Sequence, residues 1–203
     1  MRVRTTILAG VLLCGCERAA SPVGNIHDNK YIDVAVSGGQ FGDCTQDRFT
    51  GLIWEVKSDE PGLHDWRNTY SWFNPEESNR ELDYRGMPDV GTCAGSDCDT
   101  SDFIRAVNES GYCGFHDWRL PSRDELQSIS DLRKAESPPT INMEFFPHTQ
   151  ADEYWSSNDY SFQHDAAWVW NFRFGHDRVD WKKTAKYLRL VRGEAEQLLP
   201  VKE

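Results

Sequence analysis

Two short stretches of the sequence combine a histidine, a carboxylate, an indole and a guanidinium in four consecutive residues. They are GLHDWR, residues 62–67, and GFHDWR, residues 114–119. Such a set could bind a metal ion, act in acid–base catalysis or anchor a turn. Adjacent side chains on a strand point to opposite faces, and those on a helix diverge by about 100°. An adjacent His-Asp pair therefore rarely holds one ion, and turn chemistry is the better interpretation.

The other catalytic and metal patterns are weak. Five of the six histidines are followed directly by Asp, but HExxH and EF-hand spacings are absent from the sequence. A calcium site made by loop carboxylates remains an alternative, with these candidates: Asp152, Glu153, Asp159 and Asp165. No GxSxG is present, and Ser156-Ser157 has no base nearby in the sequence. We therefore do not expect an enzyme. A hydrolase of envelope polymers is the third alternative for the function.

An aromatic and polar mixture near the C-terminal end is the most distinctive candidate for binding. Indoles beside amides and charges offer a flat apolar face together with fixed hydrogen-bonding groups. The predicted ligand contacts are Trp155, Asn158, Trp168 and Trp181, with Arg178, Lys182 and Lys183 as charged contacts. For each tryptophan the competing interpretation is a place in the core.

Charge narrows the possible partners. The chain has 22 basic and 33 acidic residues, a formal net charge of -11. This argues against nucleic acid and anionic lipid surfaces as partners. The exception is the segment from Asn171 to Arg192, which contains seven basic residues and only two acidic ones, Asp177 and Asp180. Edge protection of a strand pair is the favoured explanation of this run, and a ligand-binding patch is the alternative.

The N-terminus resembles the signal of a bacterial lipoprotein. MRVR precedes a short apolar stretch, and Leu13-Cys14-Gly15-Cys16 is similar to a lipobox. The resemblance implies that Cys16 becomes the lipidated first residue and anchors the chain in a membrane. Glu17 implies sorting to the outer membrane of the cell envelope.

Four further cysteines predict two disulfides in an exported protein. Of the three possible connectivities we favour Cys93–Cys98, which closes a tight loop, and Cys44–Cys113, which ties the N-terminal part to the middle. A zinc site is the alternative, but the spacings are uneven and lack a CxxC pair.

Two helices and a series of strands must position these residues. Asp99-Thr100-Ser101 predicts the start of one helix and Gly111 its end. Ser122 and Glu125 form a capping box for a second helix with the apolar stripe Leu126, Ile129 and Leu132. The predicted strands are residues 49–56, 153–158, 166–174, 177–183 and 187–192, and the aromatic residues of 166–174 are expected to face the core. Early helices and a late sheet define an α+β class.

Length and composition divide the chain into four parts. We expect a signal peptide at 1–15, a lipidated tether at 16–30, one domain at 31–193 and a flexible tail at 194–203. Eight tryptophans, all within the expected domain, could supply its core.

Several segments together resemble a known family. TGLIWEVK (50–57), HDWRNTYSWFNP (64–75), CG-x-x-DWRLP-x-x-x-EL (113–126), YWSSN (154–158) and YLRLVRG (187–193) are similar to the domain named after the C-terminal region of the Legionella collagen-like protein. The resemblance runs from about Cys44 to Gly193. It implies a variant of the C-type-lectin-like fold shared with sulfatase-modifying enzymes, in which two short helices pack on a twisted antiparallel sheet.

The resemblance also implies a function. The namesake domain is a surface adhesin module that recognises sulfated glycosaminoglycans, but this chain lacks the collagen repeat and is acidic. We therefore expect a non-catalytic, lipid-anchored envelope module for a glycan or another surface polymer. The alternative is a structural or assembly subunit that binds an envelope protein. In the second HDWR stretch, Asp117, Trp118 and Arg119 are expected to form a buried turn anchor.

Overall fold

Two antiparallel sheets form the framework of the chain in a computed structural model, which describes residues 30–34, 43–79 and 83–194. The predicted signal peptide, Cys16, nearly all of the tether and residues 195–203 of the predicted tail lie outside the described residues. In the described part no helix is long and apolar enough to cross a membrane.

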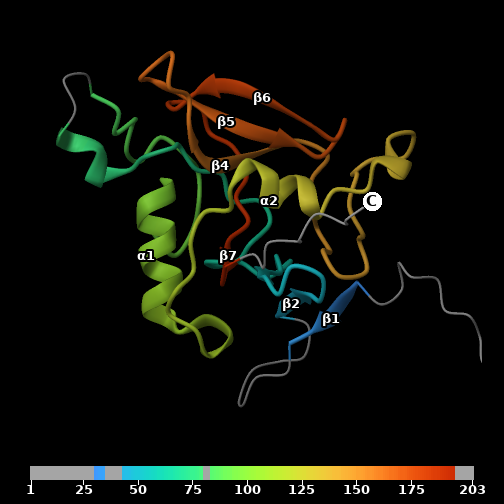
Figure 1. Cartoon of the computed structure of the whole chain (residues 1–203). Helices are drawn as coiled ribbons and strands as arrows, with labels where there is room; N and C mark the ends of the chain where they lie inside the picture. Colours follow the sequence, from blue (N-terminus) through green and yellow to red (C-terminus); the bar gives the residue numbers. More distant parts are fainter. Residues whose placement is uncertain (1–29, 35–42, 80–82, 195–203) are drawn as a thin grey trace, which may run out of the picture.

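The strands divide between a four-stranded and a three-stranded sheet, where one sheet was expected. The first sheet has the order β1 (Tyr31–Asp33), β2 (Cys44–Asp47), β3 (Ile53–Glu55) and β7 (Val191–Arg192). The second has the order β4 (Glu153–Asp159), β5 (Ala166–Asn171) and β6 (His176–Trp181). Figure 1 shows the second sheet at the top and β1 and β2 at the bottom. Because β7 pairs with β3, the end of the domain returns to its beginning.

Both predicted helices are confirmed, with their caps. Helix α1 (Thr100–Ser110) begins after Asp99, whose carboxylate accepts a hydrogen bond from the Asp102 N–H, and ends at the left-handed Gly111. Helix α2 (Arg123–Ser128) carries the complete capping box and packs against β4 and β5. The expected stripe is wrong at Leu132, because α2 ends at Ser128 and Leu132 lies exposed in the 3₁₀ turn Leu132–Lys134.

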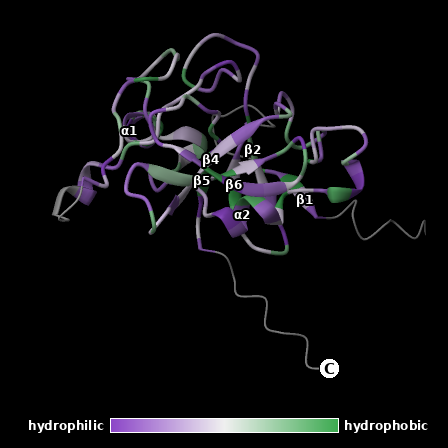
Figure 2. Ribbon diagram, turned by 90° about the horizontal axis from the view of Figure 1, so that it is seen from above, coloured by the Kyte–Doolittle hydropathy of each residue, from purple (hydrophilic) through white to green (hydrophobic). Residues whose placement is uncertain are grey.

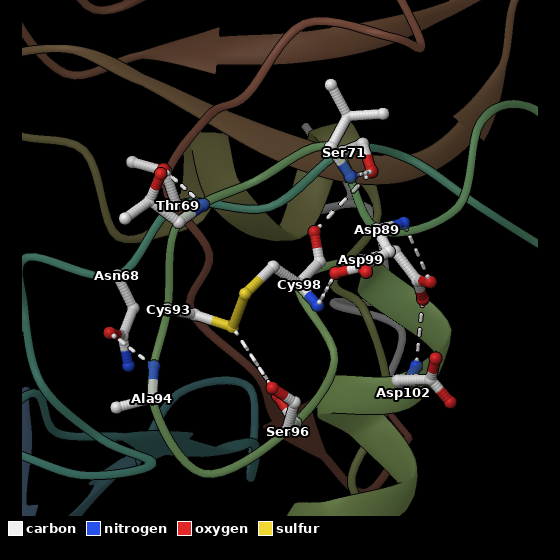
Figure 3. The surroundings of a disulfide bond; sticks show 12 residues. Asn68, Thr69, Ser71, Asp89, Cys93, Ala94, Ser96, Cys98, Asp99 and Asp102 are labelled. Carbon is white, nitrogen blue, oxygen red and sulfur yellow. Dashed lines mark hydrogen bonds between the residues drawn. A yellow bond between two sulfur atoms is a disulfide. The ribbon is translucent and has the colours of Figure 1, made fainter.

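Short turns and two disulfides shape the long loops. Two further 3₁₀ turns are Pro75–Asn79 and Tyr112–Gly114. The predicted pairs Cys44–Cys113 and Cys93–Cys98 are both present. Figure 3 shows how the second disulfide closes the loop before α1, where Asp89 accepts a hydrogen bond from the Cys98 N–H. The loop therefore leads directly into the Asp99 cap of the helix.

The core consists of two clusters that are rich in aromatic residues, one on each face of β5. Val169 packs with Trp155 in the first cluster, and Trp170 packs with Phe172 in the second. This corrects the expected alternation in residues 166–174, because Val169 is buried, Trp168 is half-buried and Phe174 is exposed. Strand β5 ends at Asn171, so Phe174 falls in the turn before β6. The outer loops are largely hydrophilic (Figure 2).

Candidate functional site

An exposed group of aromatic side chains lies where β5 extends beyond the start of α2. The register pairs Trp168 with Val179 and Ala166 with Trp181. Paired residues share a face of the sheet and alternate residues point the same way, so Trp168 and Trp181 lie on one face. Farther along the same face Trp170 is buried in the cluster that contains Leu126 of α2. We call the part left open, formed by Tyr160, Phe162, Trp168 and Trp181, the aromatic ledge.

Ring contacts hold most of the ledge together. The Tyr160 ring lies 5.6 Å from the Trp168 ring and nearly perpendicular to it, and 5.5 Å from the Phe162 ring. Phe162 is 87% exposed and Trp181 is 45% exposed. A phenyl ring so far outside the core, beside other aromatic rings, is typical of a binding surface.

Arg123, the first residue of α2, links the ledge to polar groups. Its guanidinium lies 4.6 Å from the centre of the Trp168 ring and makes an ion pair of 3.0 Å with Asp177. Its backbone N–H donates to Asn158 Oδ1 over 2.7 Å. The ledge therefore combines flat apolar faces with a fixed cation, a carboxylate and an amide, which suits a ligand with both C–H and hydroxyl surfaces.

The structure brings only part of the predicted ligand contacts together. Asn158, Trp168 and Trp181 lie at the ledge, and exposed Lys183 has its ammonium 5.9 Å from the Trp181 ring. Arg178 is exposed but lies on the other face of β6, as the partner of Val169.

Two predicted contacts are corrected. Trp155 is fully buried, and its indole N–H donates to the Tyr70 carbonyl. Lys182 is 1% exposed, since its ammonium reaches inward to Asp159 and to two backbone carbonyls.

Sequence reasoning missed Arg123 and Phe162. Arg123 is far from the ledge in sequence and reaches it only because α2 packs on the sheet. Phe162 did carry a signal, since it is a large apolar residue between Ser161 and Gln163 in a polar turn.

The basic run of residues 173–192 does not form an open cationic patch. Arg189 is fully buried, and four other basic side chains of the run make ion pairs. These pairs are Arg178–Glu153, Arg178–Asp180, Lys182–Asp159, Lys186–Glu153, Lys186–Asp180 and Arg192–Asp117. Most of the local positive charge is therefore balanced by acidic residues from other strands and loops.

The calcium candidates do not converge on one point. Glu153 and Asp159 each form an ion pair of 2.6 Å with a lysine ammonium. Across the described ranges, no group of three or more His, Cys, Asp or Glu side chains is placed to hold a metal ion.

A second concentration of titratable groups lies inside the molecule. Glu55 is fully buried, and Oε1 forms an ion pair with Lys57 Nζ over 2.7 Å and contacts His64 Nδ1 at 2.8 Å. Burial alone would raise the pKa of Glu55, but Lys57 and His64 outweigh it and hold the pKa at about 2. Burial lowers the pKa of Lys57, against the opposing effect of Glu55.

This buried cluster also ties strands together. Glu55 Oε2 accepts the Leu190 N–H, and Arg189 Nη1 donates to the Glu55 carbonyl. The ring of Tyr112 stacks on His64 at 3.8 Å and covers it. The cluster therefore connects β3 to the segment that leads into β7 and to the first HDWR stretch.

The predicted turn anchor in the second HDWR stretch is only partly right. Trp118 is buried, and its indole N–H donates to the Tyr112 carbonyl. Arg119 is half-buried and donates to the Leu120 and Gly193 carbonyls, but its main partner is Glu125. Asp117 corrects the prediction, because its side chain is exposed and pairs with Arg192 instead of loop backbone.

Fold and site together define a disulfide-bonded α+β domain that presents an aromatic surface. The family model described as the Lcl C-terminal domain matches residues 43–192. The chain therefore belongs to the Lcl C-terminal domain family. Comparison with curated proteins and with solved structures finds no significant match.

Proposed function

We propose that this chain is a non-catalytic recognition module of the bacterial cell envelope that binds a glycan or another surface polymer through the aromatic ledge. The observation that carries the proposal is the 87% exposed Phe162 beside a half-buried Trp168 that lies under the Arg123 guanidinium. Sugar rings stack their C–H faces on such aromatic surfaces, while amides and charges bind their hydroxyls. Membership of the Lcl C-terminal domain family is consistent with a surface or adhesion-type module.

The charge distribution favours a neutral ligand over a polyanion. At the ledge, Asp177 pairs with the Arg123 guanidinium. On the opposite face of the sheet, Arg178 and Lys186 pair with Glu153 and Asp180. A sulfated or phosphorylated polymer would also meet the strongly acidic remainder of the chain.

A stabilising role for the buried acid cluster supports a module without catalysis. Glu55 is fully buried and already holds Lys57, His64 and the Leu190 N–H. A general acid or base has to reach its substrate within hydrogen-bond distance. We therefore assign this cluster to stability.

We further propose a C-type-lectin-like fold and a lipid anchor on Cys16 in the outer membrane. The pairing of β7 with β3, which joins the two ends of the domain, supports the fold. The lipobox-like Leu13–Cys16 supports the anchor. Cells fed labelled palmitate should incorporate label into the full chain, and the Cys16→Ser variant should lose it.

A glycan array probed with the full chain in detergent tests the binding proposal. We expect retention of neutral glycans that is unchanged when calcium is replaced by a chelator. Failure to bind under both conditions, together with a defined protein partner crosslinked in intact membranes, would instead support an assembly subunit.

A further inference from the structure

A small cavity lies next to the aromatic ledge, at the end of β4. Its volume is about 310 Å³, at the lower end of the range for small-molecule sites. The loop Trp72–Asn74, the start of α1, the segment Arg119–Leu120 and Ser157 line it. The residues that line the cavity make none of the ring contacts or ion pairs described for the ledge.

The lining combines apolar walls with polar groups that make no hydrogen bond to the described residues. Buried Trp72 and Leu120 contribute to it, with half-buried Ile104 and Phe73 beside them. Among the described residues, the hydroxyls of Ser101 and Ser157 and Nδ2 of Asn74 make no hydrogen bond. Walls with apolar patches and separate hydrogen-bonding groups match the surface of a sugar ring, which has C–H faces and a hydroxyl rim.

The one cationic residue among the described residues that line the cavity, Arg119, does not favour an anionic ligand. Its guanidinium already donates to both carboxylate oxygens of Glu125 and to the carbonyls of Leu120 and Gly193. A hydrogen bond to Arg119 would therefore have to replace one that is already made. The hydroxyls and the amide remain the recognition groups, and these suit a neutral ligand.

Two segments join the cavity to the ledge. Ser157 lines the cavity, and the next residue, Asn158, accepts the hydrogen bond from Arg123. Leu120 also lines the cavity, three residues before Arg123, whose guanidinium covers Trp168. The cavity and the ledge are thus linked by two short chain segments at the end of β4.

We propose that this cavity is a second subsite, which holds one unit of a linear neutral glycan while neighbouring units stack on the aromatic ledge. The proposal rests on the glycan-binding function of the ledge and adds that the ligand is an oligosaccharide. Contacts made by linked units add within one molecule, so affinity should rise with chain length until both sites are filled.

Length series of three neutral glycans test the proposal: β-1,4-linked glucose, β-1,4-linked N-acetylglucosamine and α-1,4-linked glucose, each from one to five units. The full chain in detergent is titrated with each while its backbone amide signals are followed by NMR. In at least one series we expect affinity to rise about tenfold or more with length. The signals of Ser101 and Ser157 should shift only with the longer members.

A variant that fills the cavity separates the two sites. Ser157→Phe should remove the gain from length and leave single-unit binding within about twofold of wild type. Ser137→Phe is the control, because Ser137 is exposed in a turn far from both sites in the sequence. Thermal unfolding of both variants checks that the fold is kept.

The outcomes distinguish the two proposals. Binding at the ledge with equal affinity for one unit and five units, or with silent cavity signals, would overturn the second subsite and leave the ledge in place. Absence of binding in all three series would overturn both. A length gain that survives in Ser157→Phe would place the extra units outside the cavity.

Discussion

The two HDWR stretches are the same four residues folded in opposite ways. In the first, His64 reaches the buried Glu55 and Asp65 is buried, while Trp66 is half-buried and Arg67 is exposed. In the second, His116 and Asp117 are exposed and Trp118 fills the core. One stretch sends its polar half inward, and the other sends its indole inward.

Backbone pairing explains the difference. Arg119 exchanges two backbone hydrogen bonds with Val191 of β7, which fixes Trp118 and Arg119 on opposite sides of a short extended segment. The first stretch pairs instead with Ser58, whose N–H donates to the His64 carbonyl and whose carbonyl accepts the Trp66 N–H. It then forms a turn, in which the Asp65 carboxylate accepts the Arg67 N–H. The surrounding fold, and not the residue types, decides which side chain enters the core.

Removal of each indole should give the largest difference in stability between the two stretches. Trp118→Ala should lower the free energy of unfolding by about 3–5 kcal/mol, because it empties a fully packed site. Trp66→Ala should cost about 1 kcal/mol or less, since its indole N–H bonds to the exposed Asp59. Urea unfolding of both variants measures the difference, and equal losses would contradict opposite orientations.

Each stretch also contacts one glutamate, and these differ in burial. Glu55→Gln should cost about 3 kcal/mol, because it leaves Lys57 charged and buried without its partner. Glu125→Gln should cost about 1 kcal/mol, through a weaker capping box and a half-exposed pair with Arg119. Guanidinium unfolding at pH 7 compares them, and a larger loss for Glu125 would reverse our assignment.

A fall in pH should weaken the contribution of the first stretch to stability selectively. The folded pKa of Glu55 is about 2, below its ordinary value of 4.5. Its contribution is therefore complete above pH 4.5 and is lost as the pH falls from 4.5 toward 2. The gap in stability between wild type and Glu55→Gln should shrink over this window. A gap that stays constant would show that Glu55 is not held as a carboxylate by Lys57 and His64.

Replacement of the two histidines should give the smallest difference in stability between the stretches. His64→Ala should cost about 1–2 kcal/mol, because it removes a hydrogen bond to a buried carboxylate and a stacked ring. His116→Ala should cost about 0.5 kcal/mol, since the ring is exposed and, within the described residues, has one hydrogen bond, to the Asn108 carbonyl. Thermal unfolding of the pair is sufficient, and similar shifts in Tm would count against the difference.

Local signals predicted local structure well. The caps of α1 and α2 were readable because Asp99, Gly111, Ser122 and Glu125 act on neighbouring backbone groups. The sequence did not predict in the same way which side chains the rest of the fold would bury. Trp155 pairs with Val169, the neighbour of Trp168, so the two indoles lie on opposite faces of the same pair of strands, and only Trp155 is fully buried in the core.

The basic run shows the same limit. Most of its excess of positive charge is balanced in the fold, because partners such as Glu153, Asp159 and Asp117 come from other segments. Arg123 joins the candidate site for a similar reason, since only the packing of α2 on β5 brings it over Trp168.

Binding by the ledge is tested most directly by removing one of two comparable indoles. Trp168 lies 4.6 Å from the Arg123 guanidinium and Trp66 lies 4.9 Å from that of Arg67, and both are half-buried. We expect Trp168→Ala to lose about tenfold or more in affinity for the neutral glycans that the wild-type chain retains on the array, and Trp66→Ala to bind within about twofold of wild type. Unchanged binding by a folded Trp168→Ala would contradict the account.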